Sequence, residues 1–471
     1  MRIVLRILIT LVLLVVLLLA AAAVYLSVFF DPNDYKSQLA AQVEQQTGRE
    51  LTIGGDIELS VFPWVALGLR DVSLTNAQGF EAPVFAAVDE VRIGVKLLPL
   101  LQREVVMDTV TLHGLVLNLA RDSAGHTNWD DLAQPGEEPA PEPQPEAGEG
   151  MPIAALAVGG VEISDSRISW HDAQAGQQAV LRDLELETGA IEPGEPVDLE
   201  LSFTVESTEP PMTAQLSLNT VLVVDLAAQR YSARDLELET VLTGDSPPAS
   251  PMRQRVEADI EADLERQTAT VANLLVATLG LELTGGVEAT AILDAPQYTG
   301  ELRLAQFSPK DLVERLGMPP VQTTDPAVLQ AASLDTRLSG TADRVELKPL
   351  TVRLDDTTVE GEAAVASFAG PAYRFDLLVD AIDVDRYLPP AGEEDGPAEG
   401  DAEPAPGAEP PGATVGVPLE PLRALDLEGR LRIAQLKVNN LDISDVLVKV
   451  DGKDGVLAVD PLSARLYEGS L

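Results

Sequence analysis

The residues best suited to chemistry gather in one short stretch, "VTLHGLVLNLARDSAGHTNWDDL", which runs from Val110 to Leu132. It holds His113 and His126, in a chain with only 3 histidines, and ends with the acids Asp130 and Asp131. Imidazoles and carboxylates together bind metals and transfer protons. Metal ligands must converge, however, and a whole strand and a turn separate the two histidines. We therefore interpret them as turn and sheet-edge residues, and the paired acids as solvated.

The remaining motifs do not indicate catalysis either. The pair His171-Asp172 has no companion set of histidines or acids, and "VDGKDGV" (450–456) lacks the spacing of a calcium loop and predicts a hairpin turn. The sequence contains no phosphate-binding loop, nucleophile elbow, zinc-protease motif or dinucleotide fingerprint. The absence of cysteine excludes thiol nucleophiles, disulfides and cysteine-based zinc sites. We expect no enzymatic activity, no cofactor and no metal.

Size and charge narrow the class of protein. A chain of 471 residues exceeds the roughly 250–300 residues that one hydrophobic core usually serves, so several domains or an elongated fold are expected. A formal net charge of −44 argues against nucleic acid as a partner, because binding to phosphates requires Lys and Arg. The same charge disfavours electrostatic docking on anionic lipid headgroups.

The N-terminus predicts a membrane anchor. The stretch Ile7–Phe30 is uncharged and would reach about 36 Å as a helix, enough to cross a hydrocarbon core of about 30 Å. Arg2 and Arg6 precede it, which places the N-terminus in the cytoplasm and the rest of the chain beyond the membrane. The alternative is a signal peptide cleaved near Ala20–Ala23, but the apolar run continues further than such a segment needs.

Most of the remaining sequence alternates between apolar and polar residues. In "VDLELSFTVE" (197–206) every second residue is apolar, and "YRFDLLVDA" (373–381) follows the same period. This pattern is typical of antiparallel strands with one apolar and one wet face. The apolar positions are Val197, Leu199, Leu201, Phe203 and Val205 in the first run, and Tyr373, Phe375, Leu377 and Val379 in the second. An apolar face of this kind must be buried in a closed sandwich or stay open and be covered by something else, and alternation leaves both possibilities open.

The sequence also predicts two short helices, and one segment fits more than one secondary structure. Asp31 can cap a helix that Gly48 ends, and Ser308 can cap another that Gly317 ends. The segment "VEADIEADLE" (256–265) fits both a strand and a helix, and we predict a strand. The chain also repeats one pattern, as "LRDVSLTN", "LRDLELET" and "ARDLELET", which indicates a repeated strand unit.

Two acidic, proline-rich stretches read as linkers, because they contain almost nothing to bury. They divide the chain into segments, which are listed here by residue number. The anchor is 1–30, a first αβ segment is 31–133, a linker is 134–152, a central antiparallel β domain is 153–388, a second linker is 389–418, and a further β segment is 419–471.

Several blocks, taken in order, resemble the AsmA family of periplasmic proteins, which are anchored in the inner membrane of Gram-negative bacteria. They are the anchor with "DPNDYKSQLAAQVEQQTGRELTIGGDIELSVFPWVALGLRDVSLTNAQGF", then "VLNLARDSAGHTNWDDL", "VEISDSRISWHDAQAGQQAVLRDLELETG", "FSPKDLVERLG", "LDDTTVEGEAAV", "AIDVDRYLPP" and "LYEGSL". Family members typically continue beyond the point at which this chain stops, so the last segment is expected to be truncated.

The resemblance implies an elongated, curved antiparallel sheet that forms an apolar groove, together with the N-terminal transmembrane helix and a few short helices. The nine alternating apolar residues would line that groove. The implied partner is phospholipid, moved between inner and outer membrane in support of outer-membrane assembly. The alternative is a scaffold for outer-membrane protein assembly that conducts no lipid.

Overall fold

The structure is a computed structural model, and it describes residues 31–60, 64–96, 99, 106–133, 157–245, 247–370, 372–390, 426–453, 456–466 and 469–470. These residues are mainly β, with a few short helices. The predicted anchor (1–30) lies outside the described residues, and so do most residues of both predicted linkers. None of the helices within the described ranges has the length and apolar character needed to cross a membrane.

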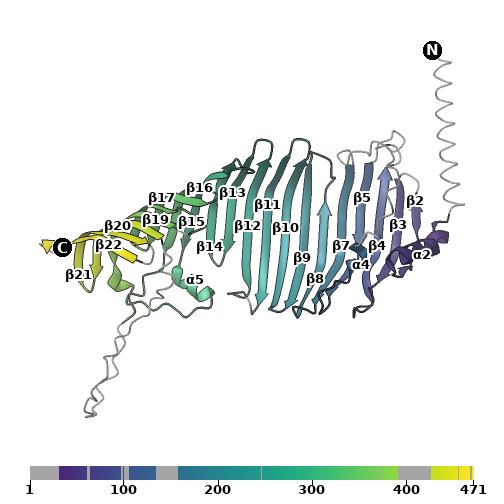
Figure 1. Cartoon of the computed structure of the whole chain (residues 1–471), viewed down its shortest axis with the longest axis horizontal. Helices are drawn as coiled ribbons and strands as arrows, with labels where there is room; N and C mark the ends of the chain where they lie inside the picture. The colour runs from purple at the N-terminus through teal and green to yellow at the C-terminus, as the bar shows by residue number, and fades with distance from the viewer. Residues whose placement is uncertain are drawn as a thin grey trace, which may run out of the picture. The chain divides into compact units, whose positions relative to one another are not determined.

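The chain divides into two compact units, Met1–Glu265 and Arg266–Leu471, hereafter unit 1 and unit 2. The sheet of unit 1 begins with β1 and β2, which both pair with β3, and continues through neighbouring strands to β12 (Figure 1). Its strands are β1 (Leu51–Ile53), β2 (Glu58–Ser60), β3 (Trp64–Thr75), β4 (Val84–Lys96), β5 (Val106–His113), β6 (Val116–Arg121), β7 (Ala157–Asp172), β8 (Gln177–Thr188), β9 (Pro196–Thr208), β10 (Pro211–Asp225), β11 (Arg230–Gly244) and β12 (Met252–Asp263).

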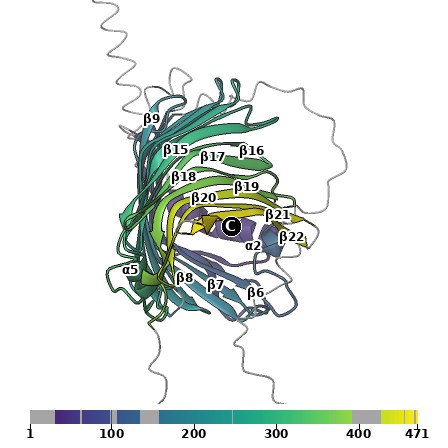
Figure 2. The ribbon, with the colours of Figure 1, turned by 90° about the vertical axis from the view of Figure 1, so that its left-hand side faces the viewer.

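In unit 2 each strand pairs with the next one along the chain, and β15 to β20 can be followed in this order in Figure 2. Its strands are β13 (Thr268–Thr278), β14 (Leu281–Thr290), β15 (Gln297–Phe307), β16 (Ala332–Thr341), β17 (Arg344–Leu354), β18 (Thr357–Val365), β19 (Ala372–Asp383), β20 (Asp426–Val438), β21 (Leu441–Lys453), β22 (Val456–Leu466) and β23 (Gly469–Ser470). The hairpin predicted at "VDGKDGV" is confirmed, since Lys453 pairs with Val456.

The prediction of a wholly antiparallel sheet is wrong at two places, because both units are mixed. Strands β5 and β6 pair in parallel with β7 in unit 1, and β19 pairs in parallel with β20 in unit 2. Two residues can close an antiparallel hairpin, but a parallel neighbour requires the chain to return along the full length of the strand. Both parallel joins follow a stretch that the sequence marks as a linker, and those stretches supply the necessary length.

The predicted helices are confirmed, and the ambiguous segment is a strand. The 3-10 helix η1 (Pro32–Tyr35) leads into α2 (Lys36–Thr47), which ends at Gly48 in the left-handed conformation. Ser308 caps α5 (Pro309–Arg315) by accepting from Asp311 N at 3.2 Å. The other short helices are α4 (Asp130–Ala133) and η3 (Val384–Arg386). Residues 256–263 of the ambiguous segment belong to β12.

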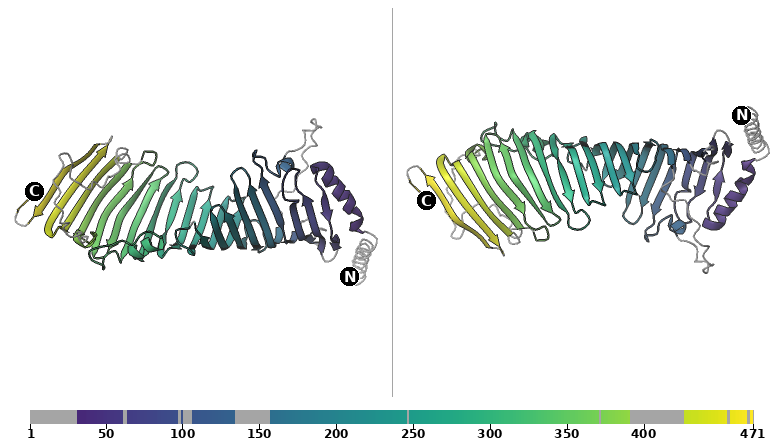
Figure 3. Two further views of the ribbon diagram at one scale, coloured as in Figure 1. Left: turned by 90° about the horizontal axis from the view of Figure 1, so that it is seen from below. Right: turned by 90° about the horizontal axis from the view of Figure 1, so that it is seen from above.

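Each sheet forms a single layer over the described residues. Within a unit, strands make extended contacts only with their hydrogen-bonded neighbours, while α2 packs against β1 at the start of unit 1 (Figure 3). Two packed sheets would bury the apolar side chains between them, but few large apolar side chains of the described strands are buried. The closed sandwich that alternation left open is therefore excluded for the described part of each unit.

The repeated sequence pattern corresponds to a repeated backbone feature. Its aspartates, Asp71, Asp183 and Asp235, have φ of 50°, 54° and 49°, a left-handed conformation that Asp and Asn tolerate best among residues with a side chain. The strand register shifts at Asp183 and at Asp235. The N–H of Asp235 donates to Asp259 Oδ1 at 2.8 Å, which satisfies a donor that the bulge removes from the ladder.

Candidate functional site

The two sides of β9 differ in chemistry, as its alternating sequence predicts. Val197, Leu199, Leu201, Phe203 and Val205 share one side, and all five are half-buried. The other side carries acids and hydroxyls, of which Asp198, Glu200 and Glu206 are exposed. Side chains that lie against a second layer would be buried, so the half-buried state reflects packing only within the sheet.

The apolar side of β9 continues across unit 1 as an apolar row, by which we mean residues directly opposite one another on successive neighbouring strands. The first row, from β3 to β12, is Leu69, Val91, Leu112, Ile163, Leu186, Leu201, Leu218, Leu238 and Val256. A second row is Leu74, Ala86, Leu117, Ile168, Leu181, Val205, Ala214, Leu242 and Met252. Every member of both rows is half-buried. Unit 1 therefore has a continuous apolar face. At one end of it Trp129, beside α4, lies 5.8 Å from the ring of Trp170, which is two residues beyond Ile168 on the same side of β7.

Unit 2 has equivalent rows through the other residues that the sequence singled out. One row, from β13 to β21, is Val276, Leu283, Leu304, Leu334, Val352, Val359, Val379, Ile433 and Val446. A second, extending to β22, is Leu274, Gly285, Leu302, Thr336, Leu350, Gly361, Leu377, Leu431, Val448 and Leu462. A third is Val271, Val287, Gly300, Leu338, Leu347, Ala363, Phe375, Gly429, Val450 and Val459.

Glycines in the rows of unit 2 let large side chains lie close to the sheet. A Cβ added to Gly429 would stand 2.1 Å from the ring of Phe375, so the ring occupies the space above that glycine. Val379 and Leu350 are 8% exposed, and Tyr373, which pairs with Val365 and Leu427, is 40% exposed. The nine predicted residues thus lie on two apolar faces, one in each unit; that they line a groove stays a prediction.

The opposite face of unit 1 is acidic. Glu162, Glu187 and Glu200 lie directly opposite one another on β7, β8 and β9, where like charges repel. They line a hollow of about 190 Å³. Further along, Arg255 of β12 forms an ion pair with Glu237 at 2.8 Å, and its neighbours raise its pKa, first through the hydrogen bond to Glu257. Charge therefore keeps this face in water, while the other face remains apolar.

The structure does not bring the sequence's histidines together. His113 Nδ1 lies 3.0 Å from Ser164 Oγ of β7, whereas the ring of His126 lies 3.3 Å from Asp122 in its own turn. His171 is exposed on β7. Strand β5 ends at His113, and Gly114, which follows it, has φ of 67°. Among the described residues no group of His and acids is arranged to hold a metal ion.

The end of the opening stretch has a structural partner that sequence reasoning missed. Arg49 is 2% exposed, stacks 4.7 Å from the centroid of Phe85, and forms an ion pair with Asp131 through Nε at 2.9 Å. Its Nη2 donates to the carbonyl of Asn128 at 2.6 Å. The hydrogen bond from Arg49 lowers the pKa of Asp131. A single arginine after a helix-ending glycine gives no indication of a partner 82 residues away.

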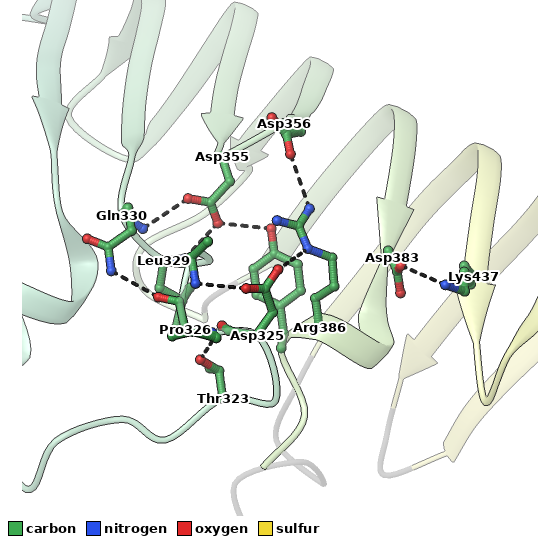
Figure 4. Close-up of polar contacts among 12 residues, drawn as sticks. Thr323, Asp325, Pro326, Leu329, Gln330, Asp355, Asp356, Asp383, Arg386 and Lys437 are labelled. Atoms are coloured by element: carbon green, nitrogen blue, oxygen red, sulfur yellow. Dashed lines mark hydrogen bonds and ion pairs between the residues drawn. The ribbon is translucent and has the colours of Figure 1, made fainter. Parts of the chain in front are cut away.

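A second polar cluster joins two of the sequence blocks quoted above, 354–365 and 381–390, to the segment that follows α5 (Figure 4). Asp355 Oδ2 accepts from the N–H of Leu329 at 2.7 Å and from the Tyr387 hydroxyl at 3.0 Å. Arg386 donates to Asp325 Oδ2 at 2.7 Å and to Asp356 Oδ2 at 3.1 Å. We call Asp325, Asp355, Arg386 and Tyr387 the clamp. It fixes the segment that follows α5 to the ends of β17 and β19.

Two pKa shifts follow from the clamp. The N–H of Ala327 and then the side chain of Arg386 lower the pKa of Asp325. Burial, and then the hydrogen bond to Asp355, raise the pKa of Tyr387 to about 12. All four groups are satisfied by one another or by backbone. The clamp is an anchoring device for the strand ends.

Comparisons with known proteins agree with the resemblance seen in the sequence. The sequence pattern of the AsmA family matches residues 1–471. Protein AsmA of Escherichia coli (strain K12) is 26% identical over 162 residues, which cover 34% of this chain and 25% of that protein. The aligned part thus spans a quarter of the length of this relative. No solved structure matches.

Proposed function

We propose that this chain, which belongs to the AsmA family, binds phospholipid by laying acyl chains along the apolar rows of its sheets. Residues 1–30 would cross the inner membrane once, with the N-terminus in the cytoplasm and the bulk of the chain in the periplasm. There it would carry phospholipid between inner and outer membrane and so support outer-membrane assembly. The proposal includes no catalytic step, cofactor or nucleic acid.

The observation that carries the proposal is the uncovered apolar row. Monomeric soluble proteins rarely expose contiguous apolar patches larger than a few hundred Å², and larger ones mark binding surfaces. Strands lie about 4.8 Å apart, so the first row of unit 1, from β3 to β12, extends over about 40 Å. One leaflet of a hydrocarbon core is about 15 Å thick, so this row exceeds the length of a lipid tail.

The energetics favour such an occupant over water. Each methylene group that leaves water contributes about 0.8 kcal/mol, and an acyl chain in contact with a row removes apolar surface from water on both partners. The rows also lack charge from end to end, whereas the acidic face stays solvated. A charge placed in a row would lose hydration under a bound tail and would therefore oppose binding.

Substitutions on the two faces of β9 test the proposal. The Leu201→Glu, Phe203→Glu variant places two charges in the apolar face, and the Ser202→Glu control places one charge on the acidic face. Full-length proteins are extracted in detergent, their folding is checked by circular dichroism, and bound phospholipid is counted by native mass spectrometry.

We expect the wild type and the control to retain phospholipid, and the folded double variant to lose it. Equal lipid content in all three would refute the lipid proposal. That result would favour the alternative scaffold, for which lipid content does not depend on this face.

A further inference from the structure

Helix α2 presents an uncharged stripe to solvent. Tyr35, at its N-cap, and Leu39, Gln42 and Gln46 are spaced by four, three and four residues, which places them on one side of the helix. Tyr35 is 45% exposed and Leu39 is 47% exposed. Ala40, Val43 and Thr47 are less exposed and lie on the side that packs against β1. The stripe is therefore separate from the packing surface of the helix.

The charge of α2 is unusual for this chain. Lys36 and Glu44 are its only charged residues, so the helix is neutral within a chain of formal net charge −44. An acidic surface is repelled by anionic lipid headgroups, but a neutral helix is not. Tyr and Leu at an exposed surface near a membrane favour the interfacial region, where aromatic rings with a polar end are enriched.

The position of α2 in the chain brings it close to the proposed anchor. The uncharged stretch Ile7–Phe30 ends one residue before the structure begins at Asp31. A chain extends at most about 3.6 Å per residue, so Tyr35 lies within about 18 Å of Phe30. Asn33 accepts from the N–H of Ile57 at 2.8 Å, and Lys36 lies 3.5 Å from Asp56, so the helical entry is held to the edge of unit 1.

We infer that α2 lies on the surface of the bilayer that holds the anchor, with Tyr35 and Leu39 at the boundary between headgroups and acyl chains. This inference rests on the proposed function, because it needs residues 1–30 to cross the membrane. The partner is the lipid surface itself, without a requirement for anionic lipid. Because α2 packs on β1, this contact also sets the orientation of unit 1 on the membrane.

The absence of cysteine makes a direct test simple. Single cysteines at Leu39→Cys and Ala41→Cys lie on different sides of α2, and both positions are exposed. The full chain, labelled with a fluorophore, is reconstituted into phosphatidylcholine vesicles that contain nitroxide-labelled lipid. We expect several-fold stronger quenching at position 39 than at position 41. Equal quenching in protein that floats with the vesicles would overturn the inference and leave the anchor intact.

Failure of the chain to float would overturn the proposed anchoring and this inference together, without bearing on lipid binding by the rows. A second measurement follows a label at Gln42→Cys. In this labelled protein, Leu39→Glu is expected to reduce the quenching at position 42 to the level seen at position 41. Ala41→Glu is expected to leave the quenching at position 42 unchanged. Unchanged quenching in Leu39→Glu would contradict the contact.

Discussion

The apolar faces of the two units are built from the same alternation but differ in how closely their side chains pack. The two rows of unit 1 described above contain no glycine, and all their members are half-buried. In unit 2, glycines such as Gly361 and Gly429 lie beside large residues, and Val379, Leu338 and Leu350 are no more than 9% exposed. Neighbouring side chains of similar size remain partly exposed to solvent. A ring that lies over a glycine instead covers the glycine backbone and the side chains beside it.

This difference shows what alternation determines and what it does not. A period of two assigns each residue to a face, because successive side chains of a strand point in opposite directions. How closely the side chains of a face pack depends on which residues become neighbours across strands. In unit 2, row members such as Val379, Leu338 and Leu350 are thus buried more deeply than the row members of unit 1.

The largest expected effect is at Gly361 in unit 2. This residue has φ of 153°, and an added Cβ would stand 2.0 Å from the carbonyl oxygen of Asp376. Gly361→Ala should therefore lower the free energy of unfolding by about 3 kcal/mol. Gly370→Ala is the matched control, because nothing lies within 4 Å of its added Cβ. Urea unfolding followed by circular dichroism measures both, and a similar cost for both would contradict the packing account.

The next effect concerns the ring of Phe375 over Gly429. Gly429→Ala alone should cost about 2 kcal/mol, because its Cβ would overlap the ring. In the Phe375→Ala background the same substitution should cost almost nothing, which gives a coupling energy of about 1–2 kcal/mol. A double-mutant cycle by urea unfolding measures this coupling. Additive costs would show that the ring does not occupy the space above the glycine.

Truncation of one residue in each face compares the units directly. Val379→Ala in unit 2 should cost about 2 kcal/mol, because Val379 is 8% exposed and its removal leaves a cavity. Leu201→Ala in unit 1 should cost about 1 kcal/mol, since Leu201 is half-buried although it is the larger side chain. Thermal unfolding of lipid-free protein measures both. The reverse order would contradict the difference in packing.

The smallest effect is a pH dependence that belongs to unit 2 alone. The folded state raises the pKa of Tyr387 from about 10 to about 12, so it holds this proton more tightly than the unfolded chain does. Its contribution to stability is complete below pH 10 and is lost as pH rises through about 12. Between pH 10 and about 12 the free energy of unfolding of Tyr387→Phe should therefore fall by about 1 kcal/mol less than that of the wild type.

Tyr373→Phe is the control for that experiment, because Tyr373 lies on the exposed part of β19. The free energy of unfolding of this variant should fall with rising pH as that of the wild type does. A Tyr387→Phe protein whose stability still falls like that of the wild type would show that the clamp does not hold this proton.

Much of the fold could be predicted from the sequence, because its signals are local. The two faces of β9 follow from its period, and the helix at 309–315 follows from its capping residue Ser308. The repeated "LRDLELET" pattern marked the strands whose aspartates adopt positive φ, although the bulge itself was not predicted.

The features that sequence reasoning missed depend on distant residues. The composition of a linker does not determine whether the next strand pairs in parallel, so the joins of β6 to β7 and of β19 to β20 were not predicted. Arg386 and Asp325 are 61 residues apart, and nothing in either segment identifies the other. The position of Phe375 over Gly429 likewise depends on the parallel pairing of β19 with β20.

The central claim is that lipid tails lie on the apolar face and not on the acidic one. Single cysteines at each position from Val197 to Val205 of β9, labelled with a fluorophore, are measured in full-length protein loaded with brominated phospholipid. Quenching is predicted to alternate with a period of two, strong at Val197, Leu199, Leu201, Phe203 and Val205 and weak between them. Uniform quenching along the strand, or none at any position, would contradict the account.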